Sequence, residues 1–512
     1  MPLRLRFYTL MGGALAGLLG TGCIRKQFFQ PDARLDATSP LPAAADSVYG
    51  ATAGRQYARH GRLYNALIGR HHRPTWAAPV AAPVLHLATV QPGGLRPGKV
   101  GGGFNSTSLS LTGSDGRAYV VRTVDKDPIR AMPELVRGTF IINMLRDNIS
   151  STNPYAALVV PPLAAAAGVP HASPRLFYVR ADDPAFQTDS LRHFRGQLAY
   201  LEEKAAPTSP PPAAVLNSTK AFATAFISPE QRFAPADLLR ARLLDGWLGD
   251  WDRHAGQWSW AVAQPSDAGP SSLVPLPKDR DMVLYRLDDG ALGWLTGHLF
   301  LRHWVTFGPR YKYPAGLLGS GHYLDQRILN GLSRAQFQAA AAAMQQRLSD
   351  TLLARAVHRL PPAAFAIEGP RTIAALQARR AALPALADEF YRVLAKRPRI
   401  GGTAQAERFT IQRYADSTVV IAESIAAGAT PAPLLRRAFL PAETRLIQLE
   451  GLAGDDVFTV EERGAHAASK PSIRIYGGAG TDAFRATGGS RGIRFSQESA
   501  PAKRAYDKPP EE

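Results

Sequence analysis

The stretch LGDWDRHAGQWSW, residues 248–260, determines how the rest of the chain is interpreted. Leucines at helical spacing precede it, and the glycine at position 249 predicts where that helix ends. The alternating segment QWSWAV, residues 257–262, predicts a strand directly afterwards. Asp250, Asp252 and His254 therefore fall in a loop between a buried helix and a strand, where rigid elements on both sides hold functional side chains in position.

A second acidic loop lies in VPLPKDRDMVLY, residues 274–285. A polar turn at 264–272 joins the first strand to LVPLP, which leads directly to Asp279. Asp279 and Asp281 stand two residues apart at a predicted strand end, and hard oxygen ligands of this kind suit Mg²⁺. The predicted order is helix, acidic loop, hairpin, acidic loop.

A glycine run opens the first organised part of the chain, GGGFNSTSLSLTGSDGRAYVVRTVDKD from residue 101. Strands are predicted at 106–111 and 118–124, joined into a hairpin. Period-two alternation puts Arg122, and Lys126 if the strand persists, on one face. Backbone N–H groups at Gly102 and Gly103 beside these cations suit the phosphates of a nucleotide. The run matches neither GxGxxG nor a Walker loop, so an ordinary hairpin is the alternative.

A helix is predicted over residues 133–149, with Glu134 near its start. Glu134 is a candidate to form an ion pair with Arg122 or Lys126. A first-turn glutamate favoured by the helix dipole is the alternative explanation. Further on, YLEEK at 200–204 and the proline-rich run at 207–212 suit a crossing between two lobes.

The composition favours a folded protein with anionic partners. The chain has 512 residues, 45% of them hydrophobic, and a formal net charge of +18. That charge favours nucleotides or lipid head groups as partners. Its arginines are scattered and no nucleic-acid motif is present, so no nucleic-acid interface is predicted. The single cysteine excludes a disulfide framework or thiolate metal site within one chain.

The N-terminal residues predict export and membrane attachment. Arg4 and Arg6 precede an apolar run at 7–19, and Gly-Thr-Gly leads to Cys23, which we expect to be lipidated. Gly20 departs from the usual lipoprotein pattern, so plain secretion or a retained anchor are alternatives. We expect an outer-membrane lipoprotein of the cell envelope, facing the periplasm or the surface, with an outer-membrane protein as a candidate partner. No later stretch approaches the roughly 20 apolar residues needed to span a bilayer.

The motifs together resemble a known group of proteins. GDWDRHAGQW resembles the DRHxxN catalytic loop of the atypical kinases, which include phosphoinositide kinases, HipA-type kinases and CotH-type kinases. PLPKDRDMVLY is similar to the CotH-type metal loop. With GGGFNSTSLSL, VVRTVDKDP, NPYAALVVPPLAAAAGVPH and GLAGDDVF, these motifs resemble the periplasmic region of Bacteroidetes-type outer-membrane surface-antigen proteins, over about residues 101–484.

The resemblance implies an α+β fold: a two-lobed protein-kinase-like domain followed by a small β module, using ATP and Mg²⁺. Asp252, with His254, would position the acceptor hydroxyl. Asp279 and Asp281 would bind the metal ion. Gln257 stands where the group has Asn and is a candidate for the metal- or phosphate-side role of that residue; the replacement leaves a pseudokinase or an altered metal geometry as alternatives.

The same resemblance sets the expected organisation. It comprises a lipoprotein signal at 1–23, a tether at 24–95, an N-lobe at 96–212, a helical C-lobe at 213–400, a β module at 401–495 and a polar tail at 496–512. The tail stands where such proteins often carry a barrel, so a barrel-less relative or a truncated product is expected. His60, His71 and His72 match no metal-ligand spacing and are expected to be exposed tether histidines.

The β module carries two related turns, GLAGDDVFTV from Gly451 and YGGAGTDAFRA from Tyr476. They resemble half of the calcium-binding nonapeptide repeat of β-solenoids. Two copies are too few for a solenoid, so strand turns are favoured over Ca²⁺ sites at Asp455 and Asp482.

Three hypotheses for function follow. The first is an envelope-anchored, kinase-like phosphotransferase with an unknown acceptor. The second is a catalytically inactive, kinase-like lipoprotein that acts as a scaffold or binding module at the outer membrane. The third is acid hydrolysis by paired carboxylates, which requires a sugar-sized groove lined by Trp247, Trp251 and Trp258; those tryptophans fit core packing better.

Overall fold

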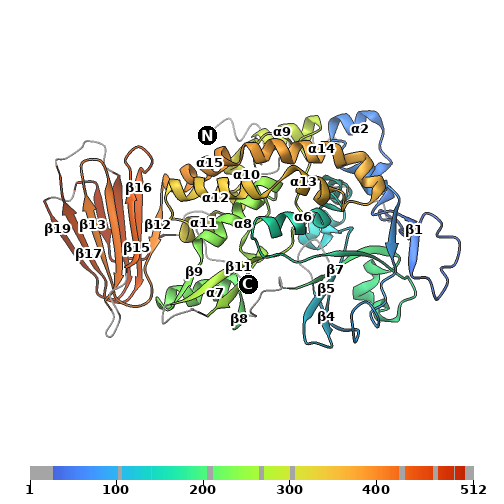
Figure 1. The fold of residues 1–512 in the computed structure, drawn as a ribbon, viewed down its shortest axis with the longest axis horizontal. Coiled ribbons are helices and arrows are strands. Elements are labelled where there is room, and N and C mark those ends of the chain that lie inside the picture. Colours follow the sequence, from blue (N-terminus) through green and yellow to red (C-terminus); the bar gives the residue numbers. More distant parts are fainter. Residues whose placement is uncertain are drawn as a thin grey trace.

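A computed structural model describes most of the chain, and Figure 1 shows its elongated arrangement. A β module lies at one end, a layer of helices runs along the middle, and the N-terminal sheet lies at the other end. The described residues are 27–101, 107–139, 141–204, 212–264, 270–299, 302, 306–425, 433–464, 471–488 and 491–501. Within them, no helix combines the length and apolar character that crossing a membrane requires.

The N-terminal sheet is antiparallel with the strand order β3-β4-β5-β7-β6. Its strands are β3 (Leu95–Gly101), β4 (Ser108–Gly113), β5 (Ala118–Thr123), β6 (Arg175–Val179) and β7 (Gln197–Glu203). The predicted hairpin is confirmed, because β4 and β5 pair from Ser108–Arg122 to Thr112–Ala118. β5 ends at Thr123, so Lys126 lies beyond the strand.

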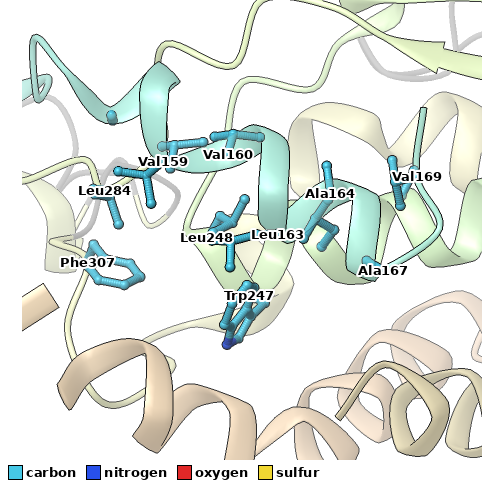
Figure 2. Close-up of a cluster of buried hydrophobic side chains, with 14 of the residues drawn as sticks. Val159, Val160, Leu163, Ala164, Ala167, Val169, Trp247, Leu248, Leu284 and Phe307 are labelled. Atoms are coloured by element: carbon cyan, nitrogen blue, oxygen red, sulfur yellow. The ribbon is translucent and has the colours of Figure 1, made fainter. Parts of the chain in front are cut away.

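The helices after β5 differ from the prediction. The segment expected to be one helix over 133–149 forms α4 (Glu134–Arg137) and α5 (Ile141–Asn148). The next helix, α6 (Ala156–Ala166), packs Val159 and Leu163 toward Trp247 and Leu248, which belong to another buried helix (Figure 2). Its central position explains why it is apolar on all sides.

Residues 27–95 are folded into the protein, so the expectation of a tether over 24–95 is wrong for this part. The segment forms β1 (Ser47–Ala51), η1 (Arg55–Ala58), α2 (Arg62–Leu67), α3 (Arg73–Ala77) and β2 (Val80–Pro83). Tyr57 and Trp76 are fully buried in the largest core. Two aromatic side chains of this size release enough apolar surface from water to anchor a segment rich in alanine and proline.

The expectation of exposed histidines is wrong for the same reason. His71 and His72 are buried. The His71 ring nitrogen Nδ1 lies 2.7 Å from the carboxylate of Asp289, and the ring of His72 bonds the carboxylate of Glu368 and a backbone carbonyl. His60 lies 2.8 Å from the carboxylate of Asp147. Each histidine is therefore paired with a different acidic partner and serves the packing.

The helical part is built on α8 (Pro235–Leu248), which is buried from Leu238 to its end except at Arg240. Gly249 ends it with a left-handed φ of 76°, as predicted. The surrounding helices are α7 (Ser218–Ile227), α9 (Ala291–Leu299), α10 (Pro314–Leu317), α11 (His322–Ile328), α12 (Arg334–Arg347), α13 (Asp350–Val357), α14 (Pro362–Ala381) and α15 (Leu383–Ala395).

A small sheet of order β8-β10-β11-β9 lies beside α8. Its strands are β8 (Ala214–Asn217), β9 (Gln231–Phe233), β10 (Trp258–Ala263) and β11 (Ser271–Pro277). The hairpin of β10 and β11 confirms the predicted order of helix, loop, hairpin and loop. Trp247 and Trp258 are fully buried, so they do not line the sugar-sized groove that the hydrolase hypothesis requires, which agrees with the expectation that they serve core packing.

The β module is a short parallel solenoid, so the expectation that two turns exclude a solenoid is wrong. One sheet has the order β12-β16-β18-β20 and the other β15-β14-β13-β17-β19. Residue 446 pairs with 472 and residue 457 with 483, a constant offset of 26. The strands are β12 (Arg399–Gly401), β13 (Glu407–Arg413), β14 (Thr418–Ser424), β15 (Pro433–Phe439), β16 (Leu446–Ala453), β17 (Val457–Glu462), β18 (Ser472–Ala479), β19 (Ala483–Thr487) and β20 (Ile493–Ser496).

Equivalent corners of successive coils carry a ladder of carboxyl groups. The Asp456 carboxylate accepts a hydrogen bond from the backbone N–H of Glu407, and the Asp482 carboxylate accepts one from the N–H of Asp456. A Cβ at Gly451 would lie 2.0 Å from an oxygen of Asp456. The repeated glycine and aspartate thus serve corner packing.

The two aspartates considered for Ca²⁺ are engaged in this packing. Asp455 accepts a hydrogen bond from the backbone N–H of Thr481, and Asp482 accepts the one from Asp456. Among the residues with described positions, no group of three metal-ligating side chains is present.

The ladder makes the solenoid pH-sensitive. Burial raises the pKa of Asp456 to about 7, with a further contribution from the charges of Glu407 and Asp482. Because an unfolded aspartate has a pKa near 3.9, the folded module holds the proton more tightly and loses stability as pH rises from about 4 to about 7. We expect Asp456→Asn, relative to the unchanged chain, to gain on the order of 5 °C in unfolding midpoint between pH 5 and pH 8.

The measurement is thermal unfolding followed by circular dichroism at both pH values. Asp416→Asn, in an exposed turn of the same module, is the matched control and should leave the pH dependence unchanged. Identical pH profiles for Asp456→Asn and the unchanged chain would contradict the assignment.

Candidate functional site

The two acidic loops meet the cationic end of β5 in one place. The guanidinium of Arg122 lies 2.7 Å from the carboxylate of Asp279, and Lys126 forms an ion pair with Asp281. β7 contributes Glu202, whose carboxylate lies 3.3 Å from Arg122. Two cations from the N-terminal sheet therefore face two carboxylates from the loop after β11. The sequence analysis placed Arg122, Lys126, Asp279 and Asp281 in one site. It did not predict that the two cations form ion pairs with the two carboxylates.

Burial gives these charges their strength. The pKa of Lys126 is lowered, chiefly by burial and against the opposing charges of Asp279 and Asp252. Burial would raise the pKa of Asp279, but the charges of Arg122 and Lys126 outweigh it and lower the pKa. Asp279 therefore stays ionised, and Asp252 is close enough to act on the Lys126 ammonium.

The backbone at Asp279 is strained. Its φ is +50°, in the left-handed region that non-glycine residues rarely adopt. A backbone conformation of this kind costs on the order of 1 kcal/mol or more and persists where the surroundings determine it. The ion pair with Arg122 and the anchoring of its neighbour Arg280 supply that constraint. Strain at a carboxylate in a cleft is typical of a ligand-binding position.

The predicted catalytic loop follows α8 directly. Asp252 has a side chain about one quarter exposed, and His254 is largely exposed, 3.9 Å from Asp252. The His254 ring accepts a hydrogen bond from the N–H of Gly256 and so caps the short helix η6 (Ala255–Gln257). Gln257 joins the two loops through its backbone, because its carbonyl accepts a hydrogen bond from the N–H of Lys278.

Among the predicted residues that the structure describes, Glu134 falls outside this cluster. Glu134 is exposed on α4, and within the described structure the ion-pair partners of Arg122 are Glu202 and Asp279. The expected pairing of Glu134 with Arg122 or Lys126 is therefore wrong. The physical reason is register, since β7 runs beside β5 and pairs Tyr200 with Arg122, which brings Glu202 to the cation. Gly102, Gly103 and Cys23 lie outside the described residues.

A buried charge network beneath both loops was missed by sequence reasoning. The Asp245 carboxylate on α8 is fully buried and accepts hydrogen bonds from Arg242, Arg253 and Arg280. Burial alone would raise the pKa of Asp245, but the three guanidinium groups lower it. Arg253 belongs to the first loop and Arg280 to the second. One carboxylate therefore holds both loops against the same helix.

Each arginine reaches further into the loops. Arg253 donates to the carbonyls of Lys278 and Gln257 and stacks on the ring of Trp258, 4.6 Å from its centroid. Arg242 donates to both carboxylate oxygens of Asp325 on α11. The sequence did contain a signal for this network. Arg242 and Asp245 lie within a helix whose leucine pattern predicts burial, and buried charges require partners.

Asp250 is the least satisfied member of this network. Its side chain is buried, neither carboxylate oxygen has a hydrogen-bond partner among the described residues, and the nearest guanidinium nitrogen is 3.7 Å away on Arg253. Burial raises its pKa to about 7, against the charge of Arg253. A buried carboxyl without a hydrogen-bond partner is costly, so Asp250 is a candidate functional residue.

The cleft is narrow. One cavity of about 60 Å³ is lined by Arg122, Lys126, Asn153, Tyr200, Asp279 and Asp281 among others, and a neighbouring one of about 40 Å³ includes Glu203, Lys204 and Lys278. Ligand pockets for drug-sized molecules measure roughly 300–1,000 Å³. Binding of a nucleotide at this position requires the two ion pairs to separate.

Distant neighbours among solved structures include two kinases. The Helicobacter pylori proinflammatory kinase CtkA matches with a TM-score of 0.31 and 13% identity, covering 58% of this chain and 95% of that one. The Golgi casein kinase matches with a TM-score of 0.26 and 11% identity, covering 58% and 74%. No family model and no curated protein matches. Both TM-scores are too low to show a shared fold, so the functional argument rests on the geometry of the cleft.

The charge network predicts a large effect of one substitution. Asp245→Asn keeps the size of the side chain but leaves Arg253 and Arg280 without a buried counter-charge. Breaking a buried ion pair by removing one partner costs about 3–5 kcal/mol. We expect that loss in the free energy of unfolding, measured by urea denaturation.

Asp182→Asn is the matched control, because the Asp182 carboxylate is 71% exposed and paired with Arg180 at the surface. It should change the free energy of unfolding by less than about 1 kcal/mol. Equal effects of the two substitutions would show that Asp245 does not hold the loops.

Proposed function

We propose that this protein is a kinase-like phosphotransferase that uses ATP and Mg²⁺. The observation that carries the proposal is the cluster in which Arg122 faces Asp279 and Lys126 faces Asp281. Phosphoryl transfer requires cationic groups at the phosphates, hard oxygen ligands for a metal ion and a group that positions the acceptor hydroxyl. These residue types meet here in one cleft.

The charge pattern supports an exchange of partners. In the cleft each cation neutralises a carboxylate of the same protein. A nucleotide with its metal carries the complementary pair of charges, so phosphate oxygens can replace the carboxylates at Arg122 and Lys126 while the metal replaces the cations at Asp279 and Asp281. Neither half of the ligand satisfies all four residues. We infer that nucleotide and metal bind interdependently.

The donor set fits Mg²⁺. Mg²⁺ is held in proteins by one or two carboxylates together with substrate phosphates and water, and Asp279 and Asp281 supply two carboxylates. The bound ion would supply charge neutralisation at the phosphates. Asp279 keeps its ionised form because Arg122 and Lys126 lower its pKa against the effect of burial.

Asp252 has the placement of an acceptor-positioning group. Its carboxylate is partly exposed beside the cleft, and its charge acts on Lys126. In the transfer step the acceptor oxygen forms a bond to the γ-phosphorus, the bond to the β,γ-bridging oxygen breaks, and ADP leaves. Asp252 accepts the proton of the acceptor hydroxyl. His254, exposed beside Asp252, is a secondary candidate for contact with the acceptor.

A second function, a catalytically inactive scaffold, is favoured by one observation. The cavities in the cleft are small, and the two ion pairs close it from both sides. Gln257 in place of Asn adds to this alternative. Attachment to the cell envelope through a lipid on Cys23 stays a prediction under both functions.

The proposal predicts interdependent binding. We expect ATP to bind the full chain at least tenfold more tightly with Mg²⁺ than with excess chelator, measured by isothermal titration calorimetry. Asp279→Ala should abolish the Mg²⁺-dependent part. Asp252→Ala should leave binding within about twofold and abolish transfer of labelled γ-phosphate, because it acts on the acceptor and not on the nucleotide.

Asp416→Ala, an exposed aspartate of the β module, is the matched control and should match the unchanged chain in both assays. Absence of nucleotide binding under every metal condition would contradict the phosphotransferase proposal and favour the inactive scaffold. Binding that is unchanged in Asp279→Ala would place the nucleotide elsewhere.

A further inference from the structure

An exposed apolar surface lies on two neighbouring helices, α2 and α9. They occupy the same edge of the helical layer, on the side away from β4, β7 and β11 (Figure 1). We define the α2/α9 surface as the exposed hydrophobic residues of these helices: Leu63, Leu67, Leu292, Trp294, Leu295 and Leu299. Leu63 is 74% exposed, Leu299 56% and Trp294 51%. An apolar surface of this kind marks an interaction site.

Glycines explain why these side chains point outward. A Cβ at Gly293 would lie 2.2 Å from the carbonyl oxygen of Leu287 and 3.5 Å from that of Ile68. A Cβ at Gly290 would lie 2.3 Å from the backbone nitrogen of Gly69. The glycine face of α9 and the turn before it are therefore pressed against the end of α2. The leucines and the tryptophan occupy the opposite face, away from the protein.

Arginines predominate among the charges around the α2/α9 surface, where the exposed Asp289, in the turn before α9, is paired with His71. From residue 290 to residue 324 the chain contains no aspartate or glutamate, and none occurs from 59 to 72. The exposed charged residues in these segments include Arg59, Arg62, Arg70 and Arg302. Apolar side chains, a tryptophan and flanking arginines on one face are the pattern of helices that lie in a membrane interface.

We propose that the α2/α9 surface docks on an anionic lipid surface. Leucine and tryptophan side chains would enter the boundary between head groups and acyl chains, and the arginines would contact anionic head groups. The cleft would then face away from the membrane, because the N-terminal sheet lies on the other side of the helical layer. This proposal does not depend on the phosphotransferase activity.

Other occupants fit less well. A second copy docked symmetrically would bring the same arginines against each other, which like-charge repulsion disfavours. Protein partners take their binding energy from anchors buried in pockets, whereas these side chains project from an outer edge, and the two cavities of the cleft lie elsewhere. A lipid surface requires no pocket and supplies negative charge.

The test uses a probe at the surface itself, because the apolar N-terminal run of the chain could bind vesicles on its own. Cys23 is replaced by Ser, and Leu295→Cys carries an environment-sensitive fluorophore. Ile227→Cys, an exposed apolar position on α7 (60% against 39% for Leu295), is the control. The probes are vesicles of phosphatidylcholine alone or with 30% phosphatidylglycerol.

We expect a blue shift of the probe at 295 with the anionic vesicles, reversed by about 0.5 M salt, and no shift at 227. Arg59→Gln, Arg62→Gln and Arg70→Gln together should raise the lipid concentration needed for half of the shift by roughly 100-fold, about fivefold for each arginine. Arg474→Gln, Arg485→Gln and Arg494→Gln, an equal change of charge on the exposed solenoid, should leave it within about threefold.

Three results would overturn the proposal. The first is vesicle binding with no shift at 295. The second is a probe already shielded without vesicles in proportion to protein concentration, which indicates self-association. The third is shielding without vesicles that is independent of concentration, which indicates coverage by another part of the chain.

Discussion

The carboxylate of Asp245 accepts hydrogen bonds from guanidinium groups of its own helix and of both loops of the candidate site. Arg242 lies one turn earlier on α8, Arg253 follows that helix, and Arg280 follows the hairpin. Asp245, Arg242 and Arg253 are buried and the Arg280 side chain is 8% exposed, so these charges depend on partners within the protein. The two loops of the candidate site depend on this network for their positions. The ion pairs of Arg122 with Asp279 and of Lys126 with Asp281 depend in turn on the position of the second loop.

The network explains why one side of the cleft is held rigidly. Arg280 is held from below, and its neighbours Asp279 and Asp281 project toward Arg122 and Lys126 from the sheet. The positive φ of Asp279 accompanies a turn in which Asp279 and Asp281 point toward the sheet while Arg280, between them, points toward Asp245. A site of this design is pre-organised on one side, and its other side can separate when a ligand replaces the ion pairs.

Local patterns predicted the elements that frame the site. Leucine spacing and Gly249 located the end of α8, and alternation located β10 and the hairpin of β4 and β5, because these signals are local. Partners that meet through tertiary structure were not predictable in this way. Glu202 reaches Arg122 through the register of β7, and Asp245 is one of several aspartates until the fold brings three arginines to it. Asn153, with a buried amide nitrogen that lacks a hydrogen-bond partner among the described residues, lines the cleft without any motif.

The remaining errors have similar causes. Alanine and proline in residues 27–95 gave the composition of a linker, while Tyr57 and Trp76, with smaller apolar side chains of the same segment, anchor it in the core. The solenoid was hidden because its first coil is 49 residues long in register, with β14 and β15 inserted, while the next is 26. A repeat whose length changes after one coil has no constant period to detect.

The most direct test is a crystal structure of the full chain with Mg²⁺ and a non-hydrolysable ATP analogue. The account predicts that Arg122 and Lys126 contact phosphate oxygens and that the ion is bound by Asp279, Asp281 or both, with the two ion pairs separated. An analogue bound elsewhere, with Arg122 still paired to Asp279 and Lys126 still paired to Asp281, would contradict it.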